Sequence, residues 1–171
     1  MRLFVAIQFS PEVHEALLRA QDVLRLQGSG RFTPPENLHL TLAFLGSVQM
    51  PDDAIRALQQ IRAKPFLVTV QGIGFFGDLC WAGAQLSPEL QVLQAQVTQA
   101  LTENGFSLEP RDFTPHLTLC RRYCPGKDFS PAAIEAALGS STCMIRRLEL
   151  MESIPGAGRM HYRSIFSQEL C

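Results

Sequence analysis

Three features that mark common protein classes are missing from this sequence. The 171 residues carry a formal net charge of −1, so total charge gives no indication of nucleic-acid binding. No stretch approaches the ~20 apolar residues that a membrane-spanning helix needs. The apolar N-terminal run ends at Gln8 and leads into a proline-initiated helix, which favours a first strand over a signal peptide.

Cysteine is present, but without a disulfide or metal-site pattern. The five cysteines are an odd number with no CxxC, and Cys120-x-x-x-Cys124 has no second Cys or His pair at zinc-like spacing. We therefore expect reduced thiols, mostly packing residues, in a cytoplasmic protein. We also expect no cofactor. A chain of this length needs no disulfide or metal to fold, and this one contains no linker, so we predict one domain over residues 1–171. We expect this domain to be a monomer.

Lysine is also scarce, because thirteen of the 15 basic residues are arginine. Arginine suits bidentate phosphate contacts and stacking on nucleobases. A chain with little net charge can therefore still hold a local cationic pocket.

One tetrapeptide occurs twice. His39-Leu40-Thr41-Leu42 recurs 77 positions later as His116-Leu117-Thr118-Leu119. A Phe-Thr-Pro step precedes each copy, and an arginine, Arg31 or Arg111, lies just upstream of each copy. The repeat indicates a duplicated unit whose halves each bring one imidazole and one hydroxyl to a shared site.

The rest of the chain alternates between helix and strand patterns. Ser-Pro steps at Ser10, Ser87 and Ser130 are typical helix starts, because serine caps the helix and proline suits its first turn. Glycines end the first helix at 28–30 and predict a turn over 72–78. We predict helices over 11–26, 51–63, 88–104 and 131–138, and strands over 3–9, 38–45, 66–70, 79–84, 145–153, 163–170 and the second His-x-Thr motif. This order favours an α+β fold with a mainly antiparallel sheet.

Strand geometry divides each motif between two faces. Alternate side chains point to opposite sides, so His39 and Thr41 share one face while Leu40 and Leu42 share the other. We expect the leucines to be buried and the polar pairs of both motifs to face a cleft. Two imidazoles can transfer protons near neutral pH and two hydroxyls can hold oxygen atoms, as phosphodiester hydrolysis requires. No Asp or Glu lies beside either motif, so we predict a metal-free site.

A packing role is the plainer interpretation of either motif alone. A single strand histidine is more often packed or solvated than catalytic. Packing would preserve the leucines of a repeat, but it would not preserve both histidines and both threonines. We therefore interpret the two copies as functional.

At these residues the sequence resembles the 2H phosphoesterase superfamily, specifically the RNA 2′,3′-cyclic phosphodiesterases formerly described as 2′-5′ RNA ligases. The similar segments are residues 2–7, 38–46 and 113–121, with Glu152-Ser153, Gly158 and Tyr162. The resemblance implies an α+β fold of two pseudo-symmetric lobes, each a mainly antiparallel β-sheet with outer helices, enclosing a central cleft. It also implies metal-independent opening of a terminal RNA 2′,3′-cyclic phosphate to a 2′-phosphate, with reversible 2′-5′ RNA ligation as an associated activity.

The resemblance also implies roles for single residues. His39 corresponds to the general acid for the leaving oxygen and His116 to the general base for water, whereas chemistry alone leaves the two histidines interchangeable. Thr41, Thr118 and Arg121 correspond to phosphate-binding residues. Strict alternation would place Arg121 on the leucine face, so the strand must bulge, twist or end before it.

Further RNA contacts are expected from aromatic and arginine side chains. The tip Phe75-Phe76-Gly77-Asp78 is shorter than the basic hairpin of many family members, so the contacts of that hairpin cannot be carried over. His14 and His161 lack a threonine at i+2, and we expect both to be solvated. The candidate RNA-contact residues are Tyr123, Arg122, Arg111, Phe9, Phe75 and Phe76.

Two other functions fit the motifs. One is a nucleotide or RNA-end binding module without turnover, which is disfavoured because binding alone does not require two proton-transfer groups. The other is a related phosphodiesterase acting on 2′-5′ linkages or cyclic ADP-ribose phosphate, which the motifs do not exclude.

Overall fold

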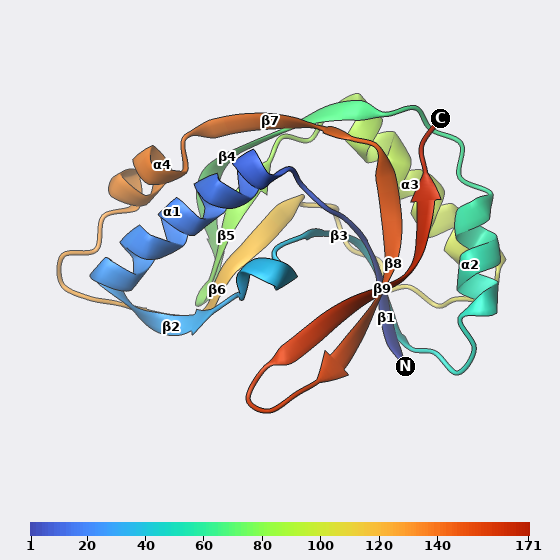
Figure 1. Ribbon diagram of the computed structural model, residues 1–171, viewed down its shortest axis with the longest axis horizontal. Coiled ribbons are helices and arrows are strands. Elements are labelled where there is room, and N and C mark those ends of the chain that lie inside the picture. Colours follow the sequence, from blue (N-terminus) through green and yellow to red (C-terminus); the bar gives the residue numbers. More distant parts are fainter.

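The computed structural model describes all 171 residues as four α-helices, one short 3₁₀ helix and nine strands (Figure 1). The helices are α1 Pro11–Gln27, η1 Pro35–Asn37, α2 Asp52–Gln59, α3 Pro88–Glu103 and α4 Pro131–Leu138. The strands are β1 Arg2–Ile7, β2 Gly28–Phe32, β3 Leu40–Ser47, β4 Phe66–Phe76, β5 Leu79–Ala84, β6 His116–Pro125, β7 Ser140–Ile145, β8 Arg147–Pro155 and β9 Met160–Glu169.

All nine strands belong to one antiparallel sheet. Its order is β7-β4-β5-β6-β3-β1-β8-β9, with β2 paired to the free part of β6. A single residue pair, Leu40 with Leu117, joins β3 to β6, so the sheet bends there into two lobes. One lobe contains β1, β3, β8 and β9, and the other contains β2, β4, β5, β6 and β7.

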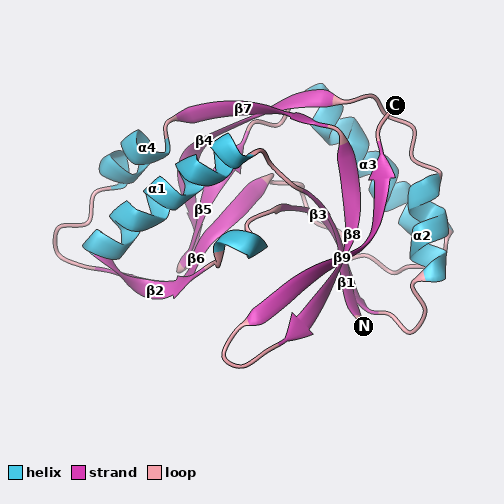
Figure 2. Ribbon diagram, in the orientation of Figure 1, coloured by secondary structure: helices cyan, strands magenta, loops and turns pink.

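The helices cover the two lobes separately. Helices α1 and α4 pack together against the lobe of β6 and β7, and α2 and α3 pack together beside the lobe of β3 and β9. Figure 2 shows these two helix pairs at opposite ends of the bent sheet. The predicted α+β fold with two lobes and outer helices is therefore confirmed.

The 77-residue offset of the tetrapeptide extends to whole elements. Strand β1 corresponds to β5, α1 to α3 and β3 to β6, each by the same shift of 77 positions. The helix starts are equivalent as well, because the hydroxyls of Ser10 and Ser87 accept hydrogen bonds from the backbone N–H of Val13 and Leu90. The internal repeat is thus a β-α-β unit that occurs once in each half of the chain.

Three predictions of local secondary structure were wrong, each in a segment that contains glycine or serine. Residues 28–32 form β2 instead of a loop, because Gly28 and Gly30 let β2 approach β6 so closely that an added Cβ would come within 2.5 Å of Cys124 O or Cys120 Sγ. Residues 72–76 continue β4 through a bulge at which Gly72 has a φ of +82°. The polar segment Ser140–Ile145 forms β7 along the edge of β4.

One cluster of 40 buried residues forms the main core. Leu40, Leu117 and Leu119 are fully buried and Leu42 nearly so, which confirms the predicted inward face of both motif strands. The cysteines are all unpaired, and burial raises the pKa of Cys80 to about 12, as expected of a packed thiol. No helix is long and apolar enough to cross a membrane.

Candidate active site

The joint between the two lobes brings the two motifs together. Leu40 lies opposite Leu117 in an antiparallel pair, and both leucines point into the core. In this register the neighbours across the joint are His39 with Thr118, and Thr41 with His116, all on the opposite face from the leucines. The two imidazoles and two hydroxyls therefore alternate around a pseudo-two-fold axis through the leucine pair.

His39 is held in one tautomer by its partners. Its Nδ1 donates to the carbonyl oxygen of Asn37 at 2.6 Å, since a carbonyl only accepts hydrogen bonds. Its Nε2 lies 2.8 Å from Thr41 Oγ1 and, being unprotonated in this tautomer, accepts the hydroxyl hydrogen. Asn37 is itself fixed, because its side-chain amide donates to the carbonyl of Met160 in β9.

The environment of His39 disfavours its charged form. Burial lowers the pKa of His39 to about 4; the hydrogen bond to Asn37 acts in the opposite direction, and the nearby charges of Arg121 and His116 lower the pKa further. The rings of Phe4 and Tyr162 lie 4.9 Å and 5.2 Å from the imidazole, centroid to centroid, and supply part of that burial. His39 is therefore neutral at neutral pH.

His116 has the same tautomer in a more open environment. Its Nδ1 donates to the carbonyl of Thr114 at 2.7 Å, so Nε2 faces the cleft. The ring of Phe76 lies 5.1 Å away at a near-perpendicular angle, and that of Trp81 lies 6.1 Å away. Trp81 in β5 is the 77-residue equivalent of Phe4 in β1, so each histidine has an aromatic neighbour on the adjacent strand.

A bulge in β6 explains the position of Arg121. Thr118 pairs with Trp81 while Cys120 pairs with Cys80, which makes Leu119 an additional residue in β6. Leu119 and Cys120 are consecutive and both fully buried, and the next residue, Arg121, is exposed. Strict alternation along the strand would have placed Arg121 on the leucine face. The bulge is therefore present as expected, and it returns Arg121 to the face of Thr118.

The first motif has an equivalent bulge that exposes a residue we did not predict. An additional residue, Leu42, interrupts the pairing of β3 with β1. It places Phe44 on the face of His39, where 65% of Phe44 is exposed. Phe44 precedes Arg121 by 77 positions, and this offset is the signal in the sequence that could have identified it.

The weaker candidates have different outcomes. Phe9 was a wrong prediction, because it is 8% exposed and belongs to the main core. Tyr123 is also buried, with its hydroxyl donating to the carbonyl of Leu24, so it lies on the helix side of β6 and not in the cleft. Arg111 is exposed and paired with Glu109, and Arg122 is exposed with a φ of 52°.

The remaining histidines lie outside the paired motifs. His161 is exposed as expected, but His14 is half-buried, and burial lowers its pKa.

No group of three or more His, Cys, Asp or Glu side chains is arranged to hold a metal ion. The cleft residues can therefore offer two proton-transfer groups, two hydroxyls and one guanidinium to a bound phosphate.

Comparison with known proteins agrees with this arrangement. The sequence model of the 2′-5′ RNA ligase superfamily matches residues 9–156. A Thermotoga maritima protein named RNA 2′,3′-cyclic phosphodiesterase is 33% identical over 138 residues, covering 74% of this chain and 73% of that protein. A Geobacillus stearothermophilus protein of the same name is 31% identical over 149 residues, covering 81% of this chain but 48% of that protein, so the chain spans about half its length.

Solved structures share the fold over almost the entire chain. The TT0787 protein of Thermus thermophilus superposes with a TM-score of 0.87 at 25% identity, covering 99% of this chain and 98% of that chain. E. coli LigT in complex with 3′-AMP superposes with a TM-score of 0.83 at 25% identity, covering 99% and 97%. The chain therefore belongs to the 2′-5′ RNA ligase superfamily of 2H phosphoesterases.

Proposed function

We propose that this protein opens the terminal 2′,3′-cyclic phosphate of RNA by metal-independent hydrolysis and leaves a 2′-phosphate. The observation that carries the proposal is the joint of β3 and β6, where His39, Thr41, His116 and Thr118 alternate around one point. Relatives of similar length that are named for this activity support the same substrate. We also propose that it acts in the cytoplasm, since none of its cysteines is paired. We further propose that it acts as a monomer.

The proposed reaction uses one histidine at each end of the phosphorus. His116 takes a proton from water as the water oxygen bonds to phosphorus, and His39 donates a proton to the 3′ oxygen as the P–O3′ bond breaks. Thr41, Thr118 and Arg121 bind the non-bridging oxygens, where negative charge increases. One water is consumed, and a 2′-phosphate and a free 3′-hydroxyl are formed.

This assignment requires His39 to gain a proton when substrate binds. A phosphate anion beside Nε2 favours the imidazolium, and it offsets the charge of Arg121, which lowers the pKa of His39. Thr41 must also turn its hydroxyl from Nε2 to a phosphate oxygen, which removes a hydrogen bond that stabilises the neutral ring. Substrate binding and protonation of His39 are therefore coupled.

The proposal is tested with an RNA oligomer that ends in 2′,3′-cyclic phosphate, incubated with the protein in EDTA. A 2′-phosphate product is expected, and separate His39→Ala and His116→Ala variants should lose most turnover, with their folding checked by circular dichroism. His161→Ala is the matched control and should retain full activity. Full activity in either motif variant, or a 3′-phosphate product, would contradict the mechanism.

A second substrate is favoured by the aromatic walls of the cleft. Exposed rings lie on both sides of the joint, Phe44 in one lobe and Phe76 in the other. Two such surfaces can stack the two nucleosides that flank an internucleotide phosphate. A 2′-5′-linked dinucleotide is therefore the second candidate substrate, tested by its cleavage under the same conditions.

A further inference from the structure

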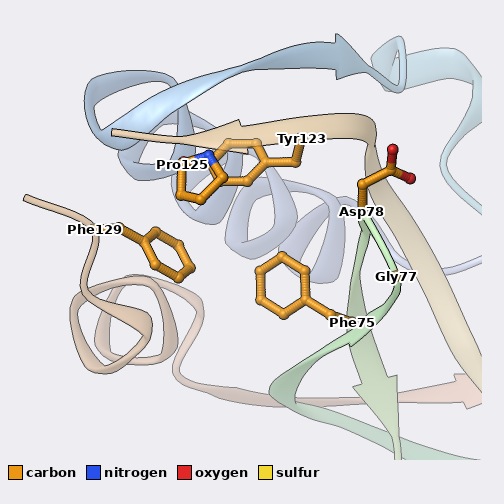
Figure 3. A pocket seen from close by; sticks show the side chains of 6 residues that line it. All are labelled: Phe75, Gly77, Asp78, Tyr123, Pro125 and Phe129. Carbon is orange, nitrogen blue, oxygen red and sulfur yellow. The ribbon is translucent and has the colours of Figure 1, made fainter. Parts of the chain in front are cut away.

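A cavity lies at the end of β6, on the other side of the β4–β5 hairpin tip from His116. Its volume is about 260 Å³, just below the range of drug-sized ligand sites. Figure 3 shows its walls, which come from the hairpin tip, the end of β6 and the segment before α4. The lining residues are Phe75, Gly77, Asp78, Tyr123, Pro125 and Phe129.

Three aromatic rings form the walls of this cavity. Phe75 and Phe129 meet nearly at right angles with their centroids 5.9 Å apart, and Tyr123 is tilted against both at 6.4 Å and 5.8 Å. Tyr123 is anchored by its hydroxyl, which donates to the carbonyl of Leu24 at 2.8 Å. Phe75 remains 37% exposed, so an aromatic surface is open to a planar ligand.

Unpaired arginines lie between this cavity and the candidate active site. Arg31 of β2 lies directly opposite Arg121 of β6, although like charges in such positions repel each other. Six arginines form ion pairs with carboxylates. None of these is Arg31, Arg121 or the adjacent Arg122. An uncompensated group of this kind fits the negative charge of a phosphate backbone.

The spacing along β6 relates the cavity to the reacting phosphate. Tyr123 follows Thr118 by five positions, which is at most about 16 Å along β6, because the bulge at Leu119 and the φ of 52° at Arg122 shorten the strand. A few nucleotides of single-stranded RNA can span this distance around the β4–β5 hairpin tip, which separates the cleft from the helix side of β6 where Tyr123 lies. Arg31 and Arg122 lie in this part of the β2–β6 pair and are not assigned to the reacting phosphate, so the backbone phosphates of such a strand would pass along them.

We propose that the aromatic cavity binds a nucleobase of the RNA strand a few nucleotides upstream of the reacting end. This inference rests on the proposed function, because only a polymeric substrate would occupy both sites. A cationic ligand fits less well, since the carboxylate of Asp78, the one charged side chain of the lining, points away from the rings in Figure 3. The cavity thus selects for RNA chain length, in the way that aromatic platforms bind single strands without reading sequence.

The test compares two substrates in the full-length protein. One is a 2′,3′-cyclic mononucleotide, and the other is a tetranucleotide ending in 2′,3′-cyclic phosphate. We expect the KM of the tetranucleotide to be about tenfold lower, and Phe129→Leu to remove that advantage without changing the KM of the mononucleotide. Phe166→Leu, a half-buried phenylalanine of the other lobe, is the matched control and should preserve the tenfold difference.

A second variant covers the case in which Phe129→Leu disturbs folding. Arg122→Gln changes an exposed side chain without an ion-pair partner, and it should raise the KM of the tetranucleotide alone and weaken its dependence on salt. Equal KM values for both substrates in the unmodified protein would overturn the proposal, as would equal effects of Phe129→Leu and Phe166→Leu.

Direct binding separates this inference from the proposed function. If neither substrate is turned over, the proposed function fails, and fluorescence anisotropy of a labelled tetranucleotide ending in 2′-phosphate then decides the role of the cavity. Weaker binding to Phe129→Leu than to Phe166→Leu supports the cavity as a base site. Equal binding to both variants refutes it.

Discussion

Protonation of His39 should make the folded protein sensitive to mild acid. The pKa of His39 is lowered from 6.5 to about 4 by burial, so below pH 6.5 the unfolded chain binds a proton that the native state does not. Stability attributable to this group is therefore unaffected above pH 6.5, falls as the pH drops, and levels off below about 4. The perturbation is His39→Gln, which keeps a neutral hydrogen-bonding side chain but cannot titrate.

The size of this effect follows from the pKa difference. The difference between 6.5 and about 4 corresponds to about 3 kcal/mol at low pH, of which about 2 kcal/mol is lost between pH 7 and pH 5. The assay is urea denaturation of the unmodified protein and His39→Gln at both pH values. Other titrating groups, including half-buried His14, are common to both proteins and cancel in the comparison.

The expected result is a loss of free energy of unfolding that is about 2 kcal/mol smaller in His39→Gln than in the unmodified protein. His116→Gln serves as the control and should keep most of the pH dependence, because His39 is still present. An equal loss in His39→Gln and the unmodified protein would refute the reasoning that burial holds His39 neutral. NMR titration of the His39 ring gives an independent reading of the same pKa.

Three further predictions concern the cleft residues Thr118 and Arg121 and the packing of Gly74 against Trp81. Thr118→Val should lower kcat/KM about 10²-fold by removing a donor to the phosphate, and Thr118→Ser should restore most of it. Arg121→Lys should recover only part of the activity lost in Arg121→Gln, as steady-state kinetics will show, because lysine keeps the charge but not the bidentate geometry. Gly74→Ala should destabilise the protein by about 1–3 kcal/mol and shift the Trp81 fluorescence, since the added Cβ would meet that indole ring at 2.1 Å; an unchanged denaturation midpoint would contradict it.

Much of the local structure was predictable from short-range chemistry. The serine caps at Ser10, Ser87 and Ser130 begin α1, α3 and α4 as expected, because capping and the first turn depend on adjacent residues. Strands β2 and β7 were missed because their glycines and serines have low strand propensity, and pairing to β6 and β4 overrides that preference.

In the candidate site, too, some features were predictable from local geometry and others depended on tertiary contacts. Alternation along a strand separates His39 and Thr41 from the leucines whatever the rest of the fold does. The bulge that redirects Arg121, and its counterpart that exposes Phe44, depend on pairing with β5 and β1. Burial of Phe9 likewise depends on segments far away in the chain, and so its prediction as an RNA contact failed.

By itself, the sequence determined that this protein contains a duplicated unit with two equivalent His-x-Thr strands and has no recognisable metal-site spacing, because repeats and spacing can be read directly from the order of the residues. Only the tertiary structure decided that the two strands meet at the Leu40–Leu117 pair and that the two histidines differ. The physical reason is that convergence is set by the joint between the lobes, and burial by contacts between strands that are distant in the sequence. His39 is enclosed by Phe4 and Tyr162, from strands at opposite ends of the chain, and that enclosure holds its pKa low.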